Sequence, residues 1–179
     1  MGRGAAFQGV IGITFTVKAS KELKLRCNRD GQNTKASFFG TIDHFCLSEI
    51  IYPFISRLYG ATANSLDCKA YNNLEEDVKA GLPNFGEPGN ELKTESYSAY
   101  EQVFRSLHGS GIILLESVGI MAVHVLNNSK GCRKYITSKY ASLYVDEYQD
   151  SSEPQHQLFL QLLELGLSAV AVGDVQQSI

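Results

Sequence analysis

Long hydrophobic runs are absent from this sequence of 179 residues. The longest apolar stretches, GIILL and GIMAVHVL, are bounded or interrupted by Glu116 and His124, whereas a membrane-spanning helix needs about 20 apolar residues. The N-terminus also lacks the apolar core and small-residue cleavage site of a signal peptide. We therefore expect no contact with a membrane and a cytoplasmic location.

Cysteine is scarce, and its spacing argues against a common metal motif. The four cysteines, Cys27, Cys46, Cys68 and Cys132, lie far apart and form no C-x-x-C pair. Zinc sites usually take such pairs as ligands. We expect reduced, buried thiols and no zinc site.

Charge is distributed unevenly along the chain. The formal net charge of −3 argues against a protein that binds polyanions over its whole surface. Residues 1–35, however, carry seven basic and two acidic side chains, a local charge of +5 that leaves −8 for the remainder. This asymmetry is typical of an edge that faces nucleic acid, but a solvated helix face would produce it equally well.

Four short β-branched or apolar segments predict strands, and helical patterns lie between them. The expected strands cover residues 9–16, 36–41, 142–146 and 168–174, and we expect the first and last to be buried. Helices are expected after the first strand, from Ile42 with a bend near Pro53, and over residues 155–165. This alternation predicts an α/β fold with a parallel sheet.

The middle of the chain breaks this alternation. Residues 81–95 are rich in Gly, Pro and Asn and predict a loop. Helices are expected at 97–107 and at 112–127, and no strand pattern is visible between roughly residues 60 and 135. We therefore expect a helical insertion over 60–135 between two α/β parts, residues 1–59 and 136–179.

Two adjacent carboxylates, Asp146 and Glu147, directly follow the predicted strand SLYV. The carboxyl ends of parallel strands are where open α/β sheets bind ligands. An aspartate there can hold Mg²⁺, and a neighbouring glutamate can polarise an attacking water. Exposed acids after a strand are also common, so the pair alone leaves a purely structural role open.

Four longer motifs carry a family resemblance. The segments ITFTVKASKELKLR, GTIDHFC, VDEYQDSSEPQ and GDVQQSI resemble motifs Ia, Ib, II and III of the UvrD/Rep-type superfamily 1 DNA helicases, in the family's order. The resemblance implies a RecA-like P-loop NTPase sheet, with the insertion at the place of the family's helical subdomain. It also implies ATP and Mg²⁺ as cofactors of the intact parent, and single-stranded DNA as its partner.

The resemblance assigns roles to individual residues. On the nucleotide side it implies Asp146 and Glu147 for Mg²⁺, Glu147 for the catalytic water, Gln177 for sensing the γ-phosphate, and Gln149 and Asp174 in support. On the DNA side it implies Phe15, Thr16, Lys18 and Thr41 along the single-strand track, where hydroxyls hold phosphates and aromatics meet bases. For Lys18, a role on the nucleotide side or in the helix alone stays open.

Two residues depart from the family's pattern. Val17 stands where the family usually has asparagine, which removes a polar side chain beside the DNA track. Asp43 stands where the family has histidine, and His44 follows one position later. A carboxylate that faced a phosphate backbone would repel it, so we expect Asp43 to weaken the DNA role of this motif.

Two other functions compete with a helicase fragment. A non-enzymatic remnant could bind DNA or a protein through the insertion. A Mg²⁺-dependent nuclease could use Asp146 and Glu147, but the further carboxylates and lysine of such sites are missing.

The strand at 168–174 has a further expected consequence. In RecA-like sheets the strand that leads to the phosphate loop lies beside it, and the chain has no such strand before residue 9. An unpaired edge invites pairing with another chain. We therefore hypothesise a homodimer formed through this edge.

The phosphate-binding half of the site is missing from the sequence. No G-x-x-x-x-G-K-[ST] loop is present, and the chain starts only a few residues before the ITFT segment. Such a loop supplies the N–H groups and the lysine that hold the β- and γ-phosphates. The second RecA-like domain of the family is also absent. We expect the chain to be a fragment that binds no ATP by itself.

The first prediction is therefore that this chain alone neither hydrolyses ATP nor unwinds DNA. Loss of one preorganised donor costs about 100- to 1000-fold in rate, so loss of the whole phosphate cradle should abolish turnover. A steady-state ATPase assay with single-stranded DNA measures it. Robust turnover would contradict the prediction.

Overall fold

The computed structural model describes residues 8–30, 34, 36–62, 65–80, 82–85, 87 and 89–173. Its main sheet has the order β2-β1-β5-β6, and every neighbouring pair in it is parallel. The strands are β1 Gly9–Ile13, β2 Phe38–Gly40, β5 Tyr140–Val145 and β6 Ser168–Ala171. The expected α/β fold with a parallel sheet is confirmed.

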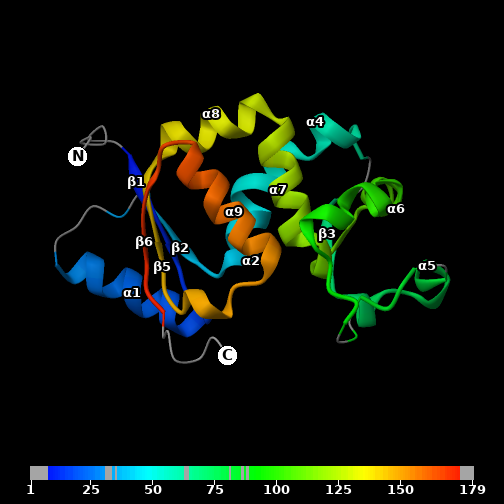
Figure 1. The fold of residues 1–179 in the computed structure, drawn as a ribbon, viewed down its shortest axis with the longest axis horizontal. Helices are drawn as coiled ribbons and strands as arrows, with labels where there is room; N and C mark the ends of the chain where they lie inside the picture. The colour runs from blue at the N-terminus through cyan, green and yellow to red at the C-terminus, as the bar shows by residue number, and fades with distance from the viewer. Residues whose placement is uncertain are drawn as a thin grey trace.

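Helices cover both faces of this sheet (Figure 1). Helix α1 (Val17–Arg29) lies on one face, and α9 (Glu153–Glu164) lies on the other, where it packs against α7 (Val118–Asn128). Between β2 and the insertion, the chain forms short helical pieces, of which η1 packs against α7. They are α2 Ile42–Phe45, the π-helical η1 Cys46–Ile51, α3 Tyr52–Phe54 and α4 Ser56–Tyr59.

The expected bend near Pro53 takes the form of the wide π turn of η1. Proline lacks an N–H group and its ring clashes with the carbonyl four residues earlier, so regular α-helical bonding cannot continue through it. A π segment is one of the recognised ways in which a helix departs from regular bonding. Here it places Cys46, Ile50 and Ile51 in the core.

The insertion is not wholly helical, and here the sequence prediction was wrong. Strands β3 (Asp67–Lys69) and β4 (Ile112–Leu114) form a separate parallel pair. Residues 112–114 were expected to begin a helix, but that helix, α7, begins at Val118. Three-residue strands are too short to show alternation, and a buried apolar run reads equally well as helix or strand.

Among the described residues, the insertion has six further elements, of which α6 packs against β4. They are η2 Tyr71–Asn73, α5 Glu76–Lys79, η3 Thr94–Ser96, α6 Tyr97–Gly109, η4 Leu115–Ser117 and α8 Lys130–Lys139. The predicted helix over 97–107 is confirmed as α6. The division of the chain at residues 59 and 135 remains a proposal. Helix α8 crosses the second of these boundaries and leads directly into β5.

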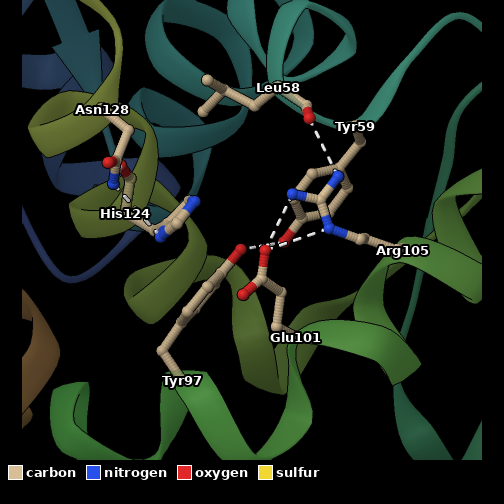
Figure 2. A network of polar contacts seen from close by, with 7 residues as sticks. All are labelled: Leu58, Tyr59, Tyr97, Glu101, Arg105, His124 and Asn128. Atoms are coloured by element: carbon tan, nitrogen blue, oxygen red, sulfur yellow. Dashed lines mark hydrogen bonds and ion pairs between the residues drawn. The ribbon is translucent and has the colours of Figure 1, made fainter.

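A cluster of aromatic and charged side chains holds the insertion against the first α/β part (Figure 2). The Tyr59 and Tyr97 hydroxyl groups are hydrogen-bonded, and the His124 ring stacks on Tyr97 with ring centroids 3.9 Å apart. Arg105 bonds Glu101 at 2.8 Å and donates to the Leu58 carbonyl at 2.9 Å. Burial lowers the pKa of His124, so the imidazole in this cluster is held in its neutral form.

A second clamp ties the end of the insertion to η1. Glu49 accepts hydrogen bonds from Lys139 and Tyr135, each at 2.7 Å. Burial of Glu49 raises its pKa, but these hydrogen bonds lower it by more, so the carboxylate stays ionised. The clamp joins segments that lie about 90 residues apart in the chain, just before β5.

The four cysteines are free, as expected, but only Cys46 and Cys132 are buried. Burial raises the pKa of Cys132 to about 12. Burial also raises the pKa of Cys68 to about 11, with contributions from Asp43, Asp67 and Glu116. These thiols are therefore held in the protonated, unreactive form at neutral pH.

Strand β6 was expected to be buried, and this was wrong as well. All four of its residues, Ser168–Ala171, are exposed. The reason is its position: β6 lies at the outer edge of the sheet, and α1 packs mainly against β1 and β2. Val170 is 50% exposed and, with Tyr144 of β5 at 46%, leaves an apolar area uncovered between α1 and the edge.

Candidate functional site

The ends of the four parallel strands lie level with one another. Ile13 of β1 is in register with Gly40 of β2 and with Val145 of β5, and Val145 is in register with Ala171 of β6. The residues that follow these ends therefore share one edge of the sheet. In order across this edge they are Thr41, then Thr14–Thr16, then Asp146 and Glu147, then Val172 and Gly173.

The acid turn, residues 146–150, is anchored by main-chain hydrogen bonds to both neighbouring strands. The Asp146 N–H donates to the Ile13 carbonyl at 3.0 Å, and the Tyr148 N–H donates to the Val172 carbonyl at 2.9 Å. Both Asp146 and Glu147 remain exposed. The backbone is thus held by the sheet while the two carboxylates point into solvent at its edge.

Glu147 has a strained backbone. Its φ of 55° and ψ of 43° lie in the left-handed region, and it is the only non-glycine residue with positive φ among those described. This conformation costs a side-chain-bearing residue about 1–2 kcal/mol. Such strain gathers at functional sites, where the surrounding structure enforces it. Here it turns the Glu147 side chain away from the strand direction immediately after Asp146.

Gln149 connects the acid turn to the segment after β6. Its side-chain amide donates to the Glu147 carboxylate at 2.6 Å. A Cβ atom added to Gly173 would lie 2.5 Å from the Gln149 side-chain oxygen, so a larger residue there would displace the Gln149 side chain. The geometry therefore couples the third motif to the glutamate of the second. Asp174 and Gln177, the other residues assigned here, lie outside the described residues.

The donor set of the acid turn suits magnesium that arrives with a phosphate. Within the described part of the chain, no group of three or more His, Cys, Asp or Glu side chains could hold a metal. Mg²⁺ is commonly bound through one or two carboxylates, with water and substrate phosphates completing its shell. Asp146, with Glu147 beside it, fits that use and does not fit a closed structural metal site.

The residues assigned to the DNA side also lie at this edge. Thr16 caps α1, accepting a hydrogen bond from the Ala19 N–H at 3.1 Å. Thr41 caps α2 in the same manner, accepting from the His44 N–H at 3.4 Å. Phe15 is partly buried, and Lys18 is exposed in the first turn of α1. Both threonines thus have a structural role as helix caps.

Thr14 was not singled out from the sequence. It is only 3% exposed, and its hydroxyl donates to the Thr16 carbonyl at 2.9 Å. This bond fixes the turn that presents Phe15 and Thr16. No signal in the sequence distinguishes it from its neighbours, because its role depends on a backbone conformation.

The Asp43 side chain is bonded within the protein. It is partly buried and bonded to Gln155 of α9, while His44 beside it is exposed. Burial raises the pKa of Asp43, and the hydrogen bond from Gln155 offsets only part of that rise. The expected repulsion of a phosphate by this carboxylate is therefore reduced, because the group is turned toward the protein.

The first turn of α9 joins three regions that the sequence does not connect. Gln155 bonds Asp43 and accepts from the Ser152 N–H at 3.0 Å. Glu153 accepts hydrogen bonds from both the N–H and the hydroxyl of Thr94 in the insertion, at 2.8 and 2.9 Å. The first turn of α9 is thereby tied to the helix after Thr41 on one side and to the insertion on the other.

Comparison with known proteins adds an independent observation. The profile of the UvrD/REP helicase N-terminal domain matches residues 56–179. The Gabija protein GajB of Bacillus cereus (strain VD045) is 33% identical over 177 residues, which is 95% of this chain and 31% of that protein.

Two further relatives match a shorter part of the chain. An ATP-dependent helicase/nuclease subunit of Streptococcus uberis is 45% identical over 58 residues, and the corresponding protein of Streptococcus suis is 37% identical over 62 residues. These matches cover 32% and 35% of this chain and 5% of each relative. The chain thus spans about a third of GajB and a small part of the two streptococcal proteins.

The strain at Glu147 leads to a prediction about stability. Replacement of Glu147 by glycine should leave the free energy of unfolding unchanged or raise it by up to about 1 kcal/mol, because glycine adopts the left-handed region without a steric penalty. Chemical denaturation measures the change.

Asp150→Gly is the matched control for Glu147→Gly. Asp150 is also exposed and lies in the same turn, but its φ is not positive. Its replacement should lower stability by about 0.5–1 kcal/mol, the usual entropic cost of glycine. If Glu147→Gly proves the more destabilising of the two, the strain is not real.

Proposed function

This chain belongs to the UvrD/REP helicase N-terminal domain family, and from that premise we propose that it forms part of an ATP-dependent DNA motor. The proposed part is the acid-bearing side of the nucleotide site together with one wall of the single-strand track. The level ends of β2, β1, β5 and β6 are the observation that carries this proposal. The described residues of the three segments that resemble motifs Ia, Ib and II, and Gly173 at the start of the fourth segment, follow these strand ends at one edge of the sheet, which supports the proposal.

On the nucleotide side, Asp146 and Glu147 would hold Mg²⁺, and Glu147 would accept a proton from the attacking water. The metal, when bound with ATP, neutralises charge on the phosphates. Gln149 supports the role of Glu147, because its amide occupies one carboxylate oxygen and leaves the other free to accept. Asp174 and Gln177 would complete this network as support and as the sensor of the γ-phosphate.

On the DNA side, Phe15, Thr16, Lys18 and Thr41 would contact the strand. The two threonine hydroxyls cap helices, and the peptide N–H groups of those first helical turns lie beside them, a place that suits phosphate. Phe15 would stack on a base. These residues follow the ends of β1 and β2, next to the acids that follow the end of β5, so DNA and nucleotide would occupy neighbouring parts of one edge.

A non-enzymatic role as a DNA- or protein-binding unit is the second candidate. The sequence has the acids but no G-x-x-x-x-G-K-[ST] loop, which favours this role for the chain by itself.

The described part of the chain contains no helix long and apolar enough to cross a membrane.

Binding to single-stranded DNA tests the proposal directly. Labelled oligothymidine should bind the chain, with an affinity that falls as salt rises. Phe15→Ala should weaken binding about 10-fold, because loss of a base-stacking aromatic costs roughly 1–3 kcal/mol. Fluorescence anisotropy gives both dissociation constants.

Tyr52→Ala is the control for Phe15→Ala, since Tyr52 is an aromatic residue 40% exposed on α3 and away from the strand ends. Its replacement should leave the affinity unchanged. No binding by the unmodified chain, or equal losses in the two variants, would refute the DNA-side proposal.

We also propose that two copies pair through the outer edge of β6. The Val172 N–H donates to the Val145 carbonyl of β5 at 2.8 Å. Alternate N–H groups along a strand point the same way, so those of Ala169 and Ala171 point outward from the sheet. Exposed donors of this kind favour edge-to-edge pairing.

Sedimentation velocity should therefore show a dimer. Ala169→Pro should shift the species to a monomer, because proline removes an outward donor and spares the bonds to β5. Ala169→Ser, which keeps the N–H group, should remain dimeric. A monomeric unmodified chain at micromolar concentration would exclude the pairing.

A further inference from the structure

The outward face of α1 is basic along its whole length. We call it the basic face of α1 and define it by Lys18, Lys21, Lys24 and Arg29, all exposed, with two apolar residues among them. Those two are Val17, 58% exposed, and Leu25, 62% exposed. At 1.5 Å per residue, the face extends about 16 Å along the helix axis. Glu22, the acidic residue of α1, is also exposed and lies at the border of this face, four residues after Lys18.

The four cations of this face have no ionic partner in the part of the chain that the structure describes. The acid of α1, Glu22, pairs with Arg26, which lies beside the face. Lys18, Lys21, Lys24 and Arg29 take part in none of the ion pairs between described residues. On an ordinary solvated helix, charges of both signs alternate and pair along the surface.

Folding does not account for this arrangement. Lys18, Lys21 and Lys24 follow one another at spacings of three residues, where like charges repel and destabilise a helix. Lys18 also lies in the first turn, near the positive end of the helix dipole. Only Arg29, in the last turn, has a favourable position relative to that dipole. A bound polyanion would relieve the repulsion among the three lysines.

The position of α1 indicates which polyanion fits. The helix begins directly after Phe15 and Thr16, at the edge of the sheet where the strand ends meet. Lys18 lies in the first turn of α1, next to that edge, and α1 leads away from the edge (Figure 1). An anionic membrane is a poorer fit, because the two apolar residues are set among cations and form no broad apolar face.

We propose that the basic face of α1 extends the single-strand track, with Lys21, Lys24 and Arg29 pairing with successive phosphates and Leu25 contacting bases. The proposal rests on the proposed function, since it concerns the same nucleic acid. It goes beyond Phe15, Thr16, Lys18 and Thr41, because it states that the single-stranded DNA runs from the sheet edge along the outside of α1. The occupant is single-stranded DNA, and binding of an acidic protein instead would overturn the proposal.

The salt dependence of DNA binding tests this extension. Each phosphate contact on a single strand contributes about −0.7 to the slope of log affinity against log salt. The double variant Lys21→Gln/Lys24→Gln should therefore reduce the magnitude of the slope by about 1.4 and weaken binding at low salt about 10-fold. Leu25→Ala should weaken binding without changing the slope.

The matched control is Lys130→Gln/Lys134→Gln. These two lysines are also exposed on a helix, α8, which lies at the opposite end of the sheet (Figure 1). The control should keep the slope of the unmodified chain. Equal effects in both double variants would show a general charge effect, and an unchanged slope in Lys21→Gln/Lys24→Gln would show that α1 makes no phosphate contact. Either result overturns the proposal.

Lys21→Glu separates binding from structure. Glutamate at this position would face lysines three residues away on both sides and relieve their repulsion. The thermal unfolding midpoint should therefore stay the same or rise, while DNA affinity falls. A fall in both would show that Lys21 acts structurally and would overturn the proposal.

The same data distinguish this inference from the function on which it rests. If Phe15→Ala weakens binding and the Lys21→Gln/Lys24→Gln pair does not, the track exists and only its extension along α1 is wrong. If the unmodified chain binds no single-stranded DNA, both fail.

Discussion

The main-chain hydrogen bond from the Asp146 N–H to the Ile13 carbonyl joins the acid turn after β5 to the DNA-side residues after β1. It continues the pairing of β1 with β5, segments separated in the chain by the whole insertion. Because this pairing sets Ile13 level with Val145, the DNA-side residues after β1 and the acids after β5 emerge at the same edge. A shift of one residue would turn every side chain of the strand to the opposite face, and the two groups would no longer meet.

The strained acid turn depends on this fixed frame. Glu147 keeps its left-handed backbone because the residues on either side of it are bonded to strands: Asp146 to β1, and Tyr148 to the segment after β6. Gln149 then orients the carboxylate, and Gly173 allows the close approach of that segment. The first turn of α9, which follows the acid turn, is fixed by further bonds. Gln155 bonds Asp43, and Glu153 bonds Thr94 of the insertion.

Most of the sheet could be predicted from the residues, whereas the insertion could be predicted only in part. Strands β1 and β5 have β-branched or aromatic runs, and α9 has clear start and stop signals in Pro154 and Gly166. Strands β3 and β4 have three residues each, too few to show the alternation of apolar and polar residues that marks a strand, so they were missed. The exposure of β6 was missed for another reason: SAVAV is apolar enough for a core strand, and only its place at the edge of the sheet leaves it uncovered.

The sequence by itself determined the family, the parallel α/β fold and the identity of the candidate acids, because these depend on local patterns and motif order. Tertiary structure alone decided how the residues are used. It turned Asp43 toward Gln155, made Thr16 and Thr41 helix caps and placed the insertion against Glu153. It also placed the cations of α1 on one unpaired face. Such contacts join residues far apart in the chain or depend on backbone direction, and neither can be read from the order of residues.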